Sequence, residues 1–358
     1  MKKGYSLFRE LLLISVGARE GFLTPLSESD LNLLYKESAR QSLMGVLYPC
    51  IERALASGTY TRNPRIAYQW TAVAMRMRTL NEMQNRRAAE LTEIFADAGF
   101  RSCVLKGQSV ARLYPDPALR QCGDIDIWVE GDRSKLVEWM RTRYSVSDIV
   151  YHHSEVAVFP DAPVEVHFHP TWLCNPGRNR KLQAYFDSVA PQQFANMCPD
   201  GFNTPTVEFQ AVQSLIHIYR HLFDGGIGIR QIMDYYYILK AMPGESRERV
   251  YSLFEDFGTA RFAAGLMWVM KELFEMDDTF LLCEPDASRG AQILHTAIRG
   301  GNFGFFYAKT RPYRGESLLH RVVRRTGNLF GYVRFYPSEV LWIPIWRIWH
   351  WFKRKSWN

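Results

Sequence analysis

The chain has 358 residues, of which 47% are hydrophobic and 23% are charged. This composition is typical of a globular protein with a large hydrophobic core, and it excludes an intrinsically disordered chain. The net charge of +7 comes from the end of the chain, because residues 311–358 hold ten Lys or Arg and two acidic residues, whereas the preceding 310 residues hold 34 basic and 35 acidic ones. A nucleic-acid-binding protein more often carries basic residues around its cleft, so we expect no specific nucleic acid partner.

The cysteines and the apolar segments favour a cytoplasmic protein. The six cysteines are scattered and include no Cys-x-x-Cys pair, which is unlike a disulfide framework or a zinc site. No apolar run approaches the length of about 18 residues that a membrane-spanning helix needs, and the first residues do not resemble a signal peptide. We therefore expect a reduced protein of the cytoplasm.

Residues 1–98 predict an N-terminal helical domain. Apolar residues recur with helical spacing over residues 5–16, 31–53 and 65–98. Ser27 and Asp30 are candidates to cap the second of these helices. We expect this domain to pack against a sheet that the next segment forms.

Residues 99–170 predict a small mixed sheet with acidic residues inside its apolar strands. Asp124 and Asp126 alternate with isoleucines, and Glu165 lies between two valines. Side chains at i and i+2 leave the same face of a strand, so the two aspartates point together, and a neighbouring strand can bring Glu165 beside them. Three carboxylates that meet in this way are stabilised by a divalent cation, and oxygen ligands suit Mg²⁺ or Mn²⁺.

The turn before the acidic strand offers groups that bind phosphate. Lys106 and Gly107 join a predicted strand over residues 100–105 to a short predicted helix over residues 108–113. Backbone N–H groups at the start of a helix bind phosphate, glycine lets the phosphate approach closely, and lysine adds a positive charge. Arg120, in the loop before the acidic strand, is a further candidate.

These motifs resemble a known protein family. Leu105-Lys106-Gly107, Arg120, Asp124-Ile-Asp126 and Glu165-Val-His167 are similar to the uncharacterised bacterial nucleotidyltransferase family that carries Lys-Gly where the polymerase-beta-like superfamily usually has Gly-Ser. The resemblance implies an α+β fold, in which a small mixed nucleotidyltransferase-type sheet is flanked by N-terminal and C-terminal helical domains. It also implies Mg²⁺-dependent transfer of a nucleoside monophosphate from an NTP to a hydroxyl acceptor, with release of pyrophosphate.

This interpretation gives each candidate residue a role. The predicted catalytic and metal-binding residues are Asp124, Asp126 and Glu165. The predicted nucleotide- and phosphate-binding residues are Lys106, Gly107 and Arg120. Since no basic patch surrounds the predicted site, a small-molecule acceptor is favoured; the alternative is a toxin-type nucleotidyltransferase that acts on tRNA or protein.

Residues 171–310 predict a C-terminal helical substrate domain. A helix is expected over residues 207–222, and after a glycine-rich loop a second helix carries Arg230 and Asp234 four residues apart. The substrate-binding candidates are His167, His217, Arg230 and Asp234. Structural alternatives stay open for some of them: a hydrogen bond within the sheet for His167, and a salt bridge along the helix between Arg230 and Asp234.

Residues 311–358 form a basic tail that holds five of the ten tryptophans within its last seventeen residues. Trp342, Trp346 and Trp349 fall on one helical face, so the stretch from Trp342 to Asn358 allows a peripheral contact with an anionic membrane. Packing of this face on the protein's own helices is the alternative. A hypothesis of another class is a noncatalytic, membrane-associated binding module on the same fold.

Overall fold

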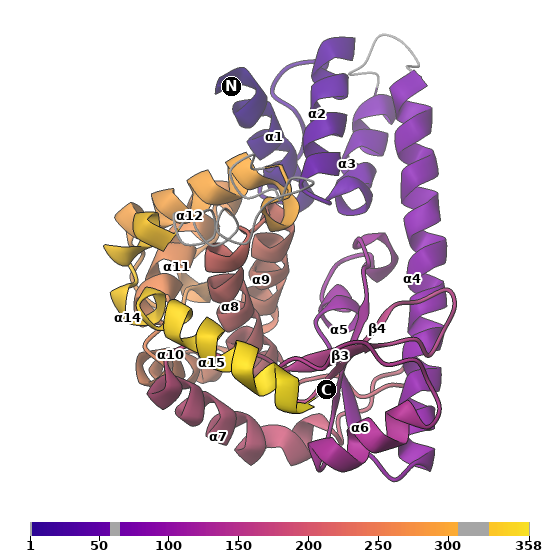
Figure 1. Ribbon diagram of the computed structural model, residues 1–358. Helices are drawn as coiled ribbons and strands as arrows, with labels where there is room; N and C mark the ends of the chain where they lie inside the picture. Colours follow the sequence, from indigo (N-terminus) through magenta and orange to yellow (C-terminus); the bar gives the residue numbers. More distant parts are fainter. Residues whose placement is uncertain (1, 58–64, 307–328, 358) are drawn as a thin grey trace, which may run out of the picture.

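The protein has an α+β fold, as predicted, with helices on both sides of a small four-stranded mixed sheet (Figure 1). The computed structural model describes residues 2–57, 65–306 and 329–357. Residues 311–328 of the predicted basic tail therefore lie outside the described residues.

The sheet contains β1 (Ser102–Leu105), β2 (Ile125–Val129), β3 (His153–Val156) and β4 (Val164–His167), in the spatial order β1-β2-β4-β3. β2 and β4 run parallel, while β1 pairs with β2, and β3 with β4, in antiparallel fashion. The parallel register places Asp126 directly beside Glu165. The sheet thus brings together carboxylates that are 39 residues apart in the sequence.

The two faces of β2 meet different partners, because its side chains alternate. Ile125, Ile127 and Val129 pack in a core with α4 (Arg65–Asp97) and α6 (Arg133–Arg141). The opposite face carries Asp126 and Trp128, and the Trp128 ring stacks on Phe209 with 5.6 Å between ring centroids. One face of the sheet is therefore a closed core, and the other faces the C-terminal helices.

The N-terminal helices are α1 (Lys2–Ser15), α2 (Glu28–Arg40), α3 (Met44–Ala56) and the long α4. Ser27 caps α2 in a capping box with Asp30, as expected. The single helix predicted over residues 31–53 is wrong, because the chain turns at Ser42, whose φ is 56°. The buried Gln41 side chain explains the break: it donates to the Ala297 carbonyl (3.1 Å) and accepts from the Ile229 N–H (2.9 Å).

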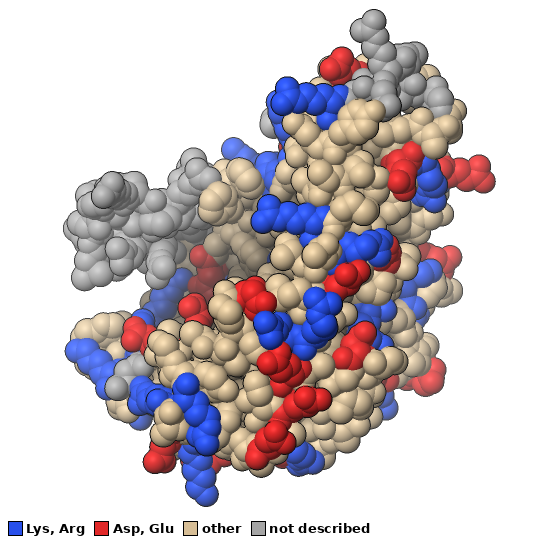
Figure 2. All heavy atoms as spheres, turned by 90° about the vertical axis from the view of Figure 1, so that its right-hand side faces the viewer, with Lys and Arg blue, Asp and Glu red and all other residues tan. Residues whose placement is uncertain are grey.

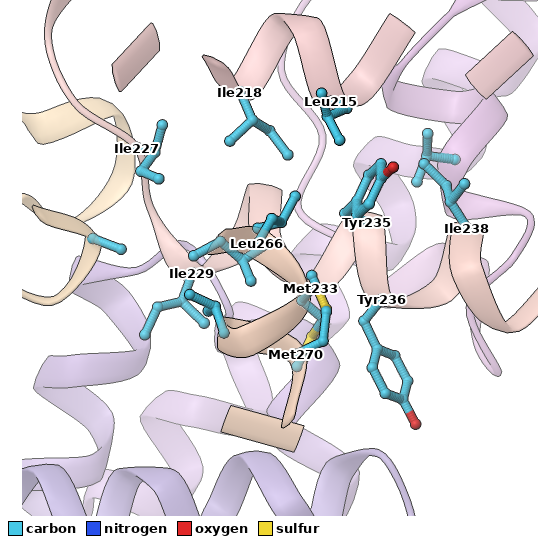
Figure 3. Packing of buried hydrophobic residues seen from close by; sticks show 14 of the residues in the cluster. Leu215, Ile218, Ile227, Ile229, Met233, Tyr235, Tyr236, Ile238, Leu266 and Met270 are labelled. Carbon is cyan, nitrogen blue, oxygen red and sulfur yellow. The ribbon is translucent and has the colours of Figure 1, made fainter. Parts of the chain in front are cut away.

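The C-terminal half is helical. Its long helices are α7 (Pro176–Gln193), α8 (Val207–Asp224), α9 (Ile229–Ala241), α10 (Arg247–Asp256), α11 (Ala260–Phe274), α12 (Ala287–Gly300) and α15 (Trp342–Trp357). Its short elements, among the described residues, are α14 (Pro337–Val340), η2 (Gly244–Ser246), η3 (Asp278–Phe280) and η4 (Asn302–Gly304), whereas α5 (Gly107–Ala111) and η1 (Pro117–Leu119) lie between β1 and β2. Figure 3 shows apolar side chains of α8, α9 and α11 interdigitating, among them Leu215, Met233 and Leu266.

The buried residues of α1, α2 and α3 belong to the same hydrophobic cluster as those of α8, α9 and α11. The N-terminal helices thus lie against the C-terminal half as well as against α4, as Figure 1 shows. The predicted division into four segments, 1–98, 99–170, 171–310 and 311–358, stays a prediction. Within the described residues, no helix is both long and apolar enough to span a membrane.

The Gln41 side chain yields a first prediction. Gln41→Leu keeps the side-chain size but leaves the Ile229 N–H buried without a partner, whereas the Ala297 carbonyl still accepts from the Gly301 N–H. We expect the free energy of unfolding to fall by roughly 1 to 3 kcal/mol for the lost partner of Ile229, measured by urea denaturation. The control, Gln69→Leu on the exposed side of α4, should change it by less than about 0.5 kcal/mol. Equal stability of the two variants would contradict this explanation of the helix break.

Candidate active site

Three carboxylates converge at the start of the two central strands of the sheet, β2 and β4. Asp124 immediately precedes β2, Asp126 lies on β2, and Glu165 lies beside Asp126 on β4. One oxygen of each carboxylate lies within 4.8 Å of the others. This is the arrangement that the strand period predicted, and its oxygen donors are those that Mg²⁺ or Mn²⁺ prefers.

Asp126 is buried and is compensated by two donors. The Lys106 ammonium and the His167 Nε2 each lie 2.7 Å from Asp126 Oδ1. Burial by itself raises the pKa of Asp126, but Lys106 and His167 outweigh burial and hold this pKa well below its usual range. Burial lowers the pKa of His167, yet the hydrogen bonds to Asp126 and Glu165 raise it above its usual value. Asp126 is therefore ionised, and His167 has its hydrogen-bonding partner inside the carboxylate cluster.

Asp124 lies close to the other two carboxylates, and Lys106 offsets their repulsion only in part. The negative charge of Asp126, then burial, then Glu165 raise the pKa of Asp124 to about 6, although Lys106 opposes them. A carboxyl group with such a raised pKa is electrostatically repelled by its neighbours when it ionises. A bound divalent cation would remove this repulsion, so the residues present fit a metal ion.

A second group of candidate metal ligands overlaps with the first. His153, Glu165 and His167 each offer one ligand atom within 4.8 Å of the others. The His153 Nδ1 lies 3.3 Å from a Glu165 oxygen, and burial lowers the pKa of His153 to about 4. Glu165 is common to both groups, so a cation bound by either group would have Glu165 among its ligands.

Lys106 has an uncommon backbone conformation. Its φ is 45° and its ψ is −124°, a region that residues with a Cβ atom rarely adopt. Strain of this kind persists where the surrounding structure holds it, often at functional sites. Gly107 starts α5, which has only five residues, so the helix dipole is small and the Lys106 ammonium supplies most of the positive charge here.

Arg120 forms a buried ion pair with Asp234 across the cleft. Its Nε and Nη2 atoms each donate to an Asp234 carboxylate oxygen at 2.7 Å, and Tyr114 Oη donates to Oδ1 at 2.7 Å. The Arg120 and Asp234 side chains are 5% and 12% exposed. The predicted phosphate role of Arg120 stays a prediction, while its observed contact joins the segment before β2 to α9.

Arg230 has more unused hydrogen-bonding capacity than Arg120. Its Nη1 donates to the Gln121 carbonyl at 3.0 Å, and its buried Nε has no partner among the described residues. Burial and then the nearby Arg120 lower the pKa of Arg230. The alternative role of Arg230 was a salt bridge along the helix with Asp234. The structure pairs Asp234 with Arg120 instead.

His217 faces the same cleft from α8. Its ring lies 4.3 Å from the ring of His221, centroid to centroid. Burial, followed by the charge of Lys106, lowers the pKa of His217 well below its usual value, and burial lowers that of His221 to about 4. Both imidazoles are therefore neutral near pH 7, and each can donate one hydrogen bond and accept one.

All the candidate residues except the buried His167 line one cleft of about 570 Å³, a volume suited to a small ligand such as a nucleotide. Its walls come from the sheet and from α8, α9 and η4. Trp172 and Arg220 line it as well, and the Arg220 guanidinium lies 3.1 Å from the centroid of the Trp172 ring. The sequence interpretation missed these two residues, because neither belongs to a motif with characteristic spacing.

A family model described as "Uncharacterised nucleotidyltransferase" matches residues 27–275, which is more than half of the chain. The chain belongs to this nucleotidyltransferase family. The protein is therefore an enzyme, and its family implies an NTP substrate. Comparison with the curated proteins gives no significant match. The Lys-Gly variant and the bacterial origin stay predictions.

The Arg120–Asp234 pair gives a second prediction. Asp234→Ala leaves the Arg120 guanidinium buried without a counter-charge, so we expect the free energy of unfolding to fall by roughly 3 to 5 kcal/mol. Chemical denaturation measures the loss. The matched control is Asp256→Ala, which breaks the exposed pair with Lys181 and should cost less than about 1 kcal/mol. If Asp234→Ala were as mild as the control, the pair would not join the two walls of the cleft.

Proposed function

We propose that the protein is a Mg²⁺-dependent nucleotidyltransferase that moves a nucleoside monophosphate from an NTP to a hydroxyl acceptor, with release of pyrophosphate. The observation that carries this proposal is the convergence of three carboxylates beside Lys106 in a cleft of nucleotide size. Asp124, Asp126 and Glu165 would hold Mg²⁺ or Mn²⁺. When bound, the ion offsets the negative charge of the triphosphate and of the transition state.

Cationic side chains would hold the phosphates. The Lys106 ammonium lies next to the carboxylate cluster, so it can contact a phosphate that shares the metal ion. Arg230 lines the same cleft and has a buried Nε without a partner in the described part of the chain, which a phosphate oxygen would satisfy. Gly107 and Arg120 complete the proposed phosphate site. The ion pair of Arg120 with Asp234 also positions α9 and therefore Arg230.

Glu165 has two alternative roles in this proposal: it completes the metal site on the acceptor side, or it acts as the general base. It is the less buried of the two strand carboxylates, with a side chain 20% exposed against 6% for Asp126. As the base, it accepts the proton of the acceptor hydroxyl, whose oxygen then forms a bond to the α-phosphorus of the NTP. The bond from that phosphorus to the bridging oxygen breaks at the same time, and pyrophosphate leaves. His167 holds Asp126 in place during this step.

The acceptor is proposed to be a small molecule. His217 on α8 and Asp234 on α9 lie opposite the sheet and form the proposed acceptor side. On the face of the molecule seen in Figure 2, basic and acidic residues are interspersed. An extended basic surface, which tRNA binding would favour, is not seen on this face. We also propose that the enzyme works in the cytoplasm, since all six cysteines are free.

Transfer of a labelled α-phosphate from the NTP to an acceptor tests this proposal. The wild-type protein is incubated with each NTP, Mg²⁺ and pools of small hydroxyl compounds, total RNA or protein, and the α-phosphate label is followed into the product. We expect Asp126→Asn to lower transfer by roughly 10²-fold or more, because a metal-binding charge is lost.

The control is Glu130→Gln. Glu130 directly follows β2, the strand that carries Asp126, and it pairs with Arg101 at the surface. This variant should transfer at the wild-type rate. Transfer that survives in Asp126→Asn would refute the assigned site, and label in RNA or protein would favour the toxin-type alternative over a small-molecule acceptor.

A further inference from the structure

The C-terminal helix α15 has two different faces. The inner face carries Ile343, Trp346, His350 and Trp357, at helical spacing, and it packs on the protein. Trp346 stacks on Trp172 with 5.7 Å between ring centroids. Both membrane contact and packing on the protein were open for this tail, and the structure assigns packing to one face only.

Polar contacts reinforce the inner face. His350 Nε2 accepts from the Tyr151 N–H at 3.2 Å, and Arg347 pairs with Asp224 at 3.1 Å. The Arg133 guanidinium lies 4.2 Å from the centroid of the Trp357 ring. These contacts reach α8, α6 and the loop before β3, so α15 is anchored at both of its ends.

The outer face of α15 is apolar and exposed. Ile345, Ile348 and Phe352 follow one another at spacings of three and four residues, which places them in one stripe along the helix. Their exposed fractions are 54%, 62% and 63%, and Trp351 beside them is 55% exposed. We call these four residues the α15 stripe. So many large apolar side chains exposed together mark an interaction site.

Charge indicates what the α15 stripe contacts. The helix contains no acidic residue and carries Lys353, Arg354 and Lys355 near its end, of which Arg354 pairs with Asp148. Lys355 continues the line of the stripe, and its ammonium lies 4.1 Å from the centroid of the Trp351 ring. A helix of 16 residues is about 24 Å long, and apolar, aromatic and basic residues together are typical of helices that lie in a membrane interface.

We infer that α15 docks lengthwise on an anionic lipid bilayer, with the α15 stripe inserted among the acyl chains and the basic end contacting the lipid headgroups. This inference does not depend on the reaction. Figure 1 shows α15 (yellow) running across the front of the molecule from α14 towards the sheet. Because Trp172 and Asp224 line the cleft and contact the inner face of α15, docking brings one wall of the cleft close to the bilayer.

Co-sedimentation of the full chain with lipid vesicles tests the inference. We expect binding to vesicles that mix phosphatidylcholine with phosphatidylglycerol, and weaker binding both at high salt and to phosphatidylcholine alone. In the variant Ile345→Ser/Ile348→Ser/Phe352→Ser, binding to the mixed vesicles should fall by about tenfold or more, because the inserted apolar surface is lost.

The matched control replaces three exposed apolar residues elsewhere, Leu23→Ser/Tyr68→Ser/Met197→Ser, and should bind as the wild type does. Thermal unfolding verifies that both variants fold. Failure of the wild type to bind the mixed vesicles, or unchanged binding by the stripe variant, overturns the inference. So does light scattering that shows a dimer which the stripe variant alone converts to a monomer, since the stripe would then contact a second copy.

Discussion

The cleft depends on charges that are buried and must therefore be compensated. The Arg120–Asp234 ion pair joins the segment before β2 to α9, and it orients the helix on which Arg230 lies one turn earlier. Separating the two partners of such a pair leaves uncompensated buried charges, which is energetically costly. The intact pair therefore keeps the two walls of the cleft together. The same constraint acts at Asp126, where Lys106 and His167 compensate the carboxylate. Among the described residues, Asp124 and the Nε of Arg230 are two cleft groups without full compensation, and a metal ion and a phosphate would satisfy them.

Local sequence pattern predicted much of the fold and of the carboxylate cluster. The period of two along a strand placed Asp124 and Asp126 on one face, and the apolar residues beside Glu165 indicated a neighbouring strand. The parallel pairing of β2 with β4 then brings Glu165 into register with Asp126. Capping at Ser27 likewise depends only on residues that are close in sequence. In each case the determining interaction lies within a few residues or follows from the strand period.

The features that the sequence did not predict depend on partners far away in the chain. Arg120 is 114 residues from Asp234, so no spacing rule distinguishes this pair from the alternative along α9 with Arg230. The break after α2 depends on Gln41, whose partners are 188 and 256 residues away. The two faces of α15 could be separated only once Trp172 and Tyr151 were placed, because tryptophan favours both a protein core and a membrane interface.

Calorimetric titration of NTPs tests whether the carboxylate cluster binds a metal ion and a nucleotide. The wild type and the variant Asp124→Asn/Asp126→Asn are each titrated with ATP, GTP, CTP and UTP, with and without Mg²⁺. We expect that at least one NTP binds to the wild type in the presence of Mg²⁺, that binding weakens without the ion, and that the variant loses the dependence on Mg²⁺. Binding that is equally tight without Mg²⁺ and unchanged in the variant would contradict the assignment of the carboxylate cluster as the metal and nucleotide site.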